Sequence, residues 1–181
     1  MSIRRVLIDT ERLRLTPIDR RHASDLHALW IEPDVRRYLW DDEIVSMSQT
    51  EDIMFRNEEQ FARLGCGLWG IAAPPSCELA GFAGFWHFRE PPELELILGL
   101  RARHWNKGFA TEAGAATIRY GFDVLGFDRI RGSADAANER SIRLMQRLGM
   151  RFDRRQIVAG LDTVFYDAWA ADQRRQVSET R

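Results

Sequence analysis

A short loop between an apolar segment and an alanine-rich segment has the residue types best suited to binding chemistry. The apolar segment spans residues 94–100, and the loop consists of Trp105, Asn106, Lys107, Gly108, Phe109 and Ala110. If a strand precedes the loop and a helix follows it, the first backbone N–H groups of that helix lack partners within it. Such donors, together with the helix dipole, bind anions such as a pyrophosphate. The alternative is a plain strand-to-helix connection in which Thr111 or Asn106 only caps the helix.

Two glycines strengthen the first interpretation. Gly108 permits backbone dihedrals, or a close approach of a ligand, that other residues disfavour. Gly99 interrupts an apolar strand, and a glycine in such a place often marks a β-bulge or a close backbone approach. A bulge at Gly99 would leave backbone groups of Leu98 and Leu100 available to an extended ligand.

A second polar pair, Asn138 and Ser141, lies further along the chain at the start of a helical segment. Asparagine is a favoured N-cap, and serine suits the first turn of a helix. From the residues alone, helix capping is the simpler interpretation of this pair.

The elements that must position these residues follow from hydrophobic periodicity and from breakers. Helices are predicted from residue 19 to a stop near Pro33, and over residues 49–64, 108–125 and 141–148. Strands are predicted over residues 12–18, 68–73, 79–88, 94–100, 129–134 and 163–169. Helices, then a run of strands, then alternating elements indicate one α+β domain over residues 1–171, followed by a polar tail over 172–181.

The composition is that of an ordinary soluble domain. The chain has 181 residues, 45% hydrophobic and 29% charged, and its net charge of −1 gives no general attraction to nucleic acid or to a membrane. No apolar run is long enough for a signal peptide or a membrane span, so a cytoplasmic protein is expected. Cys66 and Cys77 form no recognisable ligand set with the four histidines, so no metal site is predicted.

The segment 65–70 matches the pattern G-x-G-x-x-G. A dinucleotide-binding fingerprint must follow a strand and open a helix. This segment follows a predicted helix and runs toward Pro74 and Pro75, so it is interpreted as a turn that enters a strand.

Residues 95–100 and 105–113 together resemble the acetyl-CoA-binding motif of the GNAT N-acetyltransferases, in the branch that includes ribosomal-protein N-terminal acetyltransferases. Asn138-Glu139-Arg140-Ser141, followed by Leu148-Gly149-Met150, resembles the branch's second motif, N-x-x-S before a helix that ends in leucine-glycine-aromatic. The similarity spans roughly residues 9–169. Two positions depart from the pattern: Asn106 stands where the branch usually has glycine, and Met150 replaces the aromatic residue.

The resemblance implies a mixed, mostly antiparallel sheet flanked by helices, whose central strands splay apart at the bulge around acetyl-pantetheine. The acetyl group would pass directly from acetyl-CoA to an amine without an acyl-enzyme, so neither cysteine need be a nucleophile. A backbone N–H at the bulge would polarise the thioester carbonyl. Asn138 would bind the pantetheine arm, and Ser141 would orient the leaving sulfur or a water. The expected cofactor-binding residues are Leu98, Gly99, Leu100, Trp105, Asn106, Lys107, Gly108, Phe109, Ala110, Thr111, Asn138 and Ser141.

An attacking amine must lose a proton, so a base or a water relay is expected. Glu95 is the leading candidate because it lies on the strand that should carry the thioester. Alternation places it on one face with Glu93 and Ile97. The alternative is a carboxylate on a solvated face. Glu93, His87 and His104 are further candidates for the base.

Other residues have two interpretations each. Arg140, Arg143 and Arg147 have the spacing of a solvated helix face, although they, Arg101 or Arg103 are also candidates for binding the nucleotide's 3′-phosphate. Most tryptophans are expected in the core. Trp40, Trp86 and Tyr166 are candidates for the wall of the acceptor site.

The predicted activity is N-acetylation of a primary amine, on a protein N-terminus or a small molecule, by a monomer or homodimer that binds neither nucleic acid nor membrane. The alternative is a catalytically silent sensor that binds acetyl-CoA. The acceptor itself has no signature in the sequence.

Overall fold

The computed structural model describes residues 6–88 and 94–173 and contains one mixed sheet. Its strand order is β1-β2-β3-β4-β5-β6-β8-β7. Every neighbouring pair is antiparallel except β5 and β6, which are parallel. The strands are β1 (Ile8–Asp9), β2 (Arg14–Pro17), β3 (Leu68–Ala72), β4 (Gly81–His87), β5 (Leu94–Leu100), β6 (Arg129–Asp135), β7 (Arg151–Val158) and β8 (Leu161–Trp169). The predicted mixed, mostly antiparallel sheet is confirmed.

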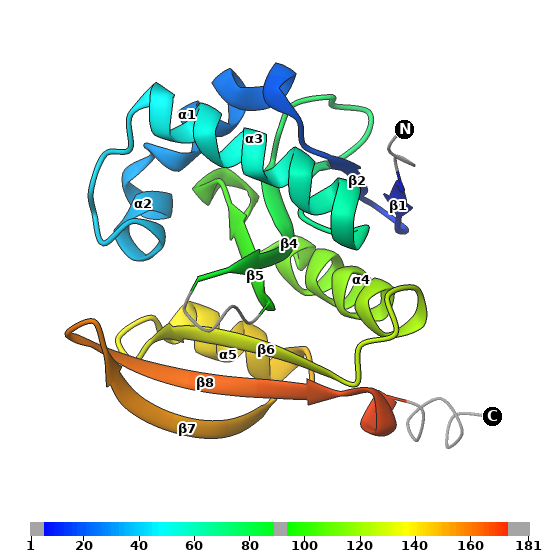
Figure 1. Cartoon of the computed structure of the whole chain (residues 1–181), viewed down its shortest axis with the longest axis vertical. Helices are drawn as coiled ribbons and strands as arrows, with labels where there is room; N and C mark the ends of the chain where they lie inside the picture. The colour runs from blue at the N-terminus through cyan, green and yellow to red at the C-terminus, as the bar shows by residue number, and fades with distance from the viewer. Residues whose placement is uncertain (1–5, 89–93, 174–181) are drawn as a thin grey trace.

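Helices surround this sheet. They are η1 (Arg20–His22), α1 (Ala23–Trp30), α2 (Pro33–Leu39), α3 (Met47–Leu64), η2 (Ala102–His104), α4 (Phe109–Asp123) and α5 (Glu139–Arg147). In Figure 1, α1, α2 and α3 gather at one end of the molecule, while α5 lies with β6, β7 and β8 at the other. β4, β5 and α4 lie between these two groups.

Both faces of the central strands are covered by apolar side chains. Leu94, Leu96 and Leu98 of β5 pack with a cluster that includes residues of α4 and α5. Ile97, between them in sequence, packs with a second cluster that includes residues of α1 and α3. This alternation is the one predicted for β5, and it assigns Glu95 to the same face as Ile97.

Several elements differ from the sequence-based predictions. The helix expected from residue 19 begins as the 3₁₀ turn η1 before α1, and α2 was missed. Pro33 is the first residue of α2, where a missing N–H costs nothing, so the proline starts a helix as well as ending one. β7 was also missed. It is an edge strand with mostly exposed residues, so it lacks the apolar alternation that reveals a strand. Of the predicted tail, residues 174–181 lie outside the described residues.

The G-x-G-x-x-G segment is a turn that enters a strand, as predicted. Gly65 ends α3 in the left-handed region at a φ of 71°, and β3 begins at Leu68. Gly67 is required by a close approach, because a Cβ there would lie 2.4 Å from Oδ1 of Asn57.

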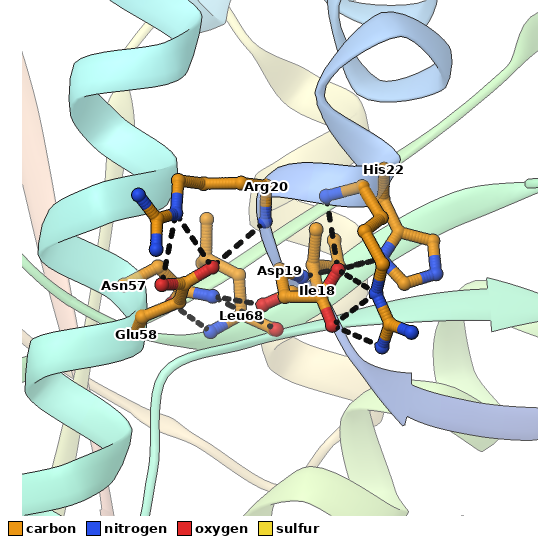
Figure 2. A network of polar contacts seen from close by, with 8 residues as sticks. Ile18, Asp19, Arg20, His22, Asn57, Glu58 and Leu68 are labelled. Carbon is orange, nitrogen blue, oxygen red and sulfur yellow. Dashed lines mark hydrogen bonds and ion pairs between the residues drawn. The ribbon is translucent and has the colours of Figure 1, made fainter.

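Asn57 of α3 joins the helix to two strands (Figure 2). Its side chain is fully buried, and its Nδ2 donates to the Ile18 carbonyl at 2.9 Å. Its Oδ1 accepts from the Leu68 N–H at 2.7 Å. The amide thus satisfies backbone groups just after β2 and at the start of β3. Beside it, Glu58 pairs at the surface with Arg20.

Asn57→Ala is expected to lower the free energy of unfolding by roughly 2–4 kcal/mol, because it leaves a buried N–H and a buried C=O without partners. Urea unfolding followed by circular dichroism measures the loss. The control is Glu58→Ala, which removes an exposed ion pair and should cost less than about 1 kcal/mol. Similar losses in the two variants would contradict the role given to Asn57.

Candidate active site

The N-terminus of α4 is open. Its N-cap is Gly108, in the left-handed region at a φ of 80°, and no side chain of the described residues caps it. The Glu112 N–H donates to the Gly108 carbonyl at 3.0 Å as the helix begins, so the N–H groups of Phe109, Ala110 and Thr111 precede the helical ladder. Capping by Thr111 or Asn106 is therefore wrong, and the geometry is that of an anion site. Asn106 is also left-handed, at a φ of 59°, as its residue type allowed.

β5 and β6 part next to this loop (Figure 1). Within the described residues they pair in register at Glu95 and Arg131 alone. At the far end of β5, the Arg101 N–H donates to Ala80 on the β4 side at 3.0 Å. Because backbone groups alternate in direction along a strand, those of Leu98 and Leu100 point away from β4, toward the parting. The Leu100 carbonyl there accepts from Nε1 of Trp105 at 2.9 Å. The predicted splay is confirmed.

The predicted bulge at Gly99 is wrong. The described β4–β5 ladder keeps one continuous register, from His87 opposite Leu94 to Gly81 opposite Leu100. Gly99 lies opposite Phe82, and a Cβ at Gly99 would lie 2.6 Å from the Phe82 ring. Glycine is therefore required at position 99 because the Phe82 side chain of the neighbouring strand β4 packs against it, and not because the strand has a bulge. The strands therefore separate because β6 diverges from β5, without a distortion of β5 against β4.

Glu95 lies at the point where the strands part, and it is only 2% exposed. The alternative of a solvated carboxylate is therefore wrong. Ser133, two residues beyond Arg131 on β6, donates from Oγ to Oε2 of Glu95. Sequence reasoning missed Ser133, although alternation along β6 from Arg131 places it on the face of Glu95. Glu93, the neighbouring candidate, lies outside the described residues.

An ion cluster with a buried Arg131–Asp167 pair supports β6 beside Glu95. Arg131 donates from Nε and Nη2 to the two carboxylate oxygens of Asp167 on β8, each at 2.9 Å. Its Nη2 also donates to Asp153 on β7 at 3.0 Å. Such bidentate pairing satisfies the charges that burial would otherwise penalise. The cluster joins β6, β7 and β8 at the position where Arg131 is the register partner of Glu95. Nothing in the sequence alone indicated this cluster.

The second motif meets the first at this loop. Oδ1 of Asn138 accepts from the Ser141 N–H at 3.2 Å, so Asn138 is the N-cap of α5 and the capping interpretation is confirmed. Ser141 itself is half-buried. The guanidinium carbon of Arg140 lies 4.1 Å from the centroid of the Trp105 ring. The start of α5 therefore contacts the first residue of the loop.

The other candidate bases differ in their surroundings. Both ring nitrogens of His104 are buried, with no hydrogen-bond partner among the described residues. Burial, aided by the charge of Lys107, lowers the pKa of His104, so its imidazole is neutral at pH 7. His87 is exposed at the end of β4. Neither histidine is hydrogen-bonded to Glu95 in the described structure.

Two of the arginines that were candidates for binding the 3′-phosphate, Arg101 and Arg103, have other partners. Arg101 pairs with Glu32 and donates to the Leu79 carbonyl, and its side chain is mostly buried. Arg103 pairs with Glu78 at the surface. These contacts give Arg101 and Arg103 structural roles.

The candidate acceptor-site aromatics divide between the two faces of the sheet. Trp86 is the register partner of Glu95, so the two side chains share a face of the sheet. Trp40 and Trp86 both pack with the apolar cluster that contains Ile97. Both are half-buried. Tyr166 is buried in the opposite cluster, against Phe152, and so lies on the other face of the sheet from Glu95.

Neither cysteine has the surroundings of a nucleophile. Cys66 is buried, and burial raises the pKa of its thiol to about 11. Cys77 is exposed. Among residues 6–88 and 94–173, no three His, Cys, Asp or Glu side chains gather as a metal site would require. None of the helices described there has the length and apolarity to cross a bilayer.

Comparisons with known proteins agree with this geometry. A family profile described as an acetyltransferase (GNAT) domain matches residues 12–151. The uncharacterized N-acetyltransferase p20 of Bacillus licheniformis is 29% identical over 143 residues, which cover 78% of this chain and 80% of that protein. The uncharacterized N-acetyltransferase YoaA of Bacillus subtilis (strain 168) is 29% identical over 156 residues, covering 80% and 82%.

Solved structures have the same fold. A putative GnaT-family acetyltransferase from Bordetella pertussis superposes with a TM-score of 0.78 at 22% identity, covering 90% of this chain and 99% of that one. RimL, a ribosomal L7/L12 alpha-N-protein acetyltransferase in complex with coenzyme A, gives a TM-score of 0.77 at 18% identity, covering 91% and 98%. Because the family profile matches residues 12–151, the chain belongs to the GNAT acetyltransferase family and is an acetyl-CoA-dependent N-acyltransferase.

Proposed function

We propose that the enzyme acetylates a primary amine where β5 and β6 part, with Glu95 as the group that receives the amine proton. The observation that carries this proposal is the position of one buried carboxylate. Glu95 lies on β5 at the parting, and the same strand leads through η2 to the open N-terminus of α4. Acid–base chemistry and anion binding are thus combined along a single stretch of chain.

The donor site fits acetyl-CoA, which supplies an activated acetyl thioester when bound. The N–H groups from Gly108 to Thr111 would hold its pyrophosphate, aided by the dipole of α4. Backbone groups of Leu98 and Leu100 would pair with the pantetheine amides. Asn138 and Ser141 would complete the site from the start of α5, which already contacts Trp105 through Arg140.

The chemistry assigned to these residues is direct transfer. The amine nitrogen forms a bond to the thioester carbonyl carbon, the bond from that carbon to sulfur breaks, and the amine proton passes to Glu95. The sulfur leaves as a thiolate, which takes up a proton from water, and Glu95 then releases its proton to solvent. Ser141 orients the sulfur or a water rather than acting as a strong acid, because a serine hydroxyl has little intrinsic acidity. A backbone N–H on the gap side of β5 would polarise the carbonyl.

The acceptor is proposed to be a protein N-terminus or a small-molecule primary amine. RimL, which has the same fold, is named as acting on the α-amino group of a ribosomal protein. The half-buried Trp40 and Trp86 lie on the Glu95 face and are the proposed wall of the acceptor site.

Release of coenzyme A thiol from acetyl-CoA, measured against a panel of amines and N-terminal peptides, tests this function. Turnover with any member supports it and names the acceptor class. A parallel titration follows binding through the fluorescence of the tryptophans, one of which, Trp105, lies in the loop. Saturable binding without turnover across the panel would favour a silent sensor, and absence of binding would overturn the donor site.

A further inference from the structure

Two residues near the start of the chain reach the first turn of α4. Oγ1 of Thr10 donates to Oε1 of Glu112 at 2.6 Å, and the backbone N–H of Arg12 donates to the same oxygen at 2.8 Å. The Arg12 side chain donates from Nε to Oε2 of Glu112 at 2.7 Å, and its Nη2 lies 2.6 Å from the same oxygen. About a hundred residues of chain separate these partners, so the contact exists only in the folded protein.

The same guanidinium also holds the phosphate loop. Nη1 of Arg12 donates to the Lys107 carbonyl at 2.9 Å, and the guanidinium carbon lies 5.1 Å from the centroid of the Phe109 ring. In a planar trans peptide the C=O and the following N–H point in opposite directions. The bond to Lys107 therefore turns the Gly108 N–H away from the Arg12 guanidinium.

Arg12 also compensates a charge that would oppose an anion. Glu112 lies in the first turn of α4, where a carboxylate suits the helix dipole but repels a pyrophosphate. Although burial acts to raise the pKa of Glu112, the hydrogen bonds from Thr10 and Arg12 outweigh it and lower that pKa. The carboxylate is therefore ionised at pH 7, and its charge beside the loop is balanced by the bound guanidinium.

We propose that Arg12 is a positioning residue of the pyrophosphate site, which orients the Lys107–Gly108 peptide and neutralises Glu112 so that the loop accepts the diphosphate of coenzyme A. This inference rests on the proposed donor site. Arg12 acts through the loop and through Glu112, although its place in the sequence indicated only a strand.

A purely structural ion pair would affect turnover of every acetyl donor alike. A positioning role would affect only turnover of the acetyl donor that carries the diphosphate. Acetyl-CoA and acetyl-pantetheine share the thioester and the pantetheine arm, but only acetyl-CoA carries the diphosphate. Arg12→Met is expected to lower kcat/KM for acetyl-CoA by about 10- to 50-fold, since it removes charge-assisted hydrogen bonds that orient the loop. The same variant should change kcat/KM for acetyl-pantetheine by less than about twofold.

The matched control is Arg14→Met, two residues along, where the arginine pairs with Asp9 at the surface. This variant should leave kcat/KM for both acetyl donors within about twofold of the wild-type values. Arg12→Lys keeps the charge but lacks the fork that serves Glu112 and Lys107 together, so it should recover only part of the loss. This second variant, with melting temperatures for all of them, keeps the test valid if Arg12→Met folds poorly.

Equal losses for the two donors, or no loss for acetyl-CoA, would overturn the positioning role. Calorimetric binding of coenzyme A to the same variants separates this outcome from failure of the proposed function, because binding does not require turnover. If the wild type binds coenzyme A without acetylating any amine, weaker binding by Arg12→Met still supports the inference. Unchanged binding by that variant rejects it.

Discussion

Glu95→Gln is expected to lower kcat by about 10²- to 10⁴-fold, while the Kd for coenzyme A stays within about twofold of the wild type. The carboxamide keeps the shape of the side chain and can still accept the hydrogen bond from Ser133. It cannot take up the proton that the attacking amine must lose. The measurement is steady-state thiol release with the best amine of the panel, together with calorimetric titration of coenzyme A.

The control for this change is Glu59→Gln, the same substitution at an exposed position on α3. It should leave kcat and the Kd unaltered. Turnover by the Glu95 variant equal to the wild type would remove Glu95 as the base and direct attention to a water relay. A large loss of coenzyme A binding in that variant would instead assign Glu95 a role in the shape of the donor site.

Gly108→Val is expected to weaken coenzyme A binding by at least about 100-fold. A β-branched residue is strongly disfavoured at a φ of 80°, and its Cβ would lie 3.2 Å from Nη2 of Arg12. Relief of that strain must rotate the peptides on either side of residue 108, which moves the N–H donors of the loop. Tryptophan fluorescence and calorimetry both report the loss of binding.

Gly126→Val provides a matched control for Gly108→Val. Gly126 has a φ of 71°, and a Cβ there would meet no atom within 4 Å. It lies after α4, between that helix and β6, so its substitution brings similar backbone strain without touching the loop. It should lower stability by about 1–2 kcal/mol and leave coenzyme A affinity within about twofold. Binding by Gly108→Val as tight as that of the Gly126 variant would contradict the loop assignment.

Elements with a strong local pattern were predicted within a few residues of their observed bounds. The capping box at Ser46 and the left-handed Gly65 mark the ends of α3, and the apolar run 94–100 is β5 itself. β7 was missed because an exposed edge strand needs no apolar face. The first motif and the N-x-x-S motif were both expected to bind the same cofactor, and the contact between Arg140 and Trp105 brings the two motifs together.

Errors arose where one strand's side chains depend on another strand. The sequence identified Gly99 as special, but Phe82 on β4 determines why, and no bulge results. The register of β8 against β6 also places Tyr166, a candidate for the acceptor-site wall, on the opposite face from Glu95, which its residue type alone did not indicate. The face on which a side chain lies depends on pairing with a partner strand, which a single strand's sequence does not specify.

By itself, the sequence determined the proposed donor loop, because the open start of α4 depends on neighbours within a few residues: a left-handed glycine, an asparagine that tolerates the same dihedrals, and small residues after them. Tertiary structure alone decided how that loop and the proposed base, Glu95, are held. Arg12 meets Lys107 and Glu112, and Ser133 meets Glu95, across separations of 95, 100 and 38 residues. Hydrogen bonds between such distant residues follow from the packing of strands and helices, which local periodicity does not encode.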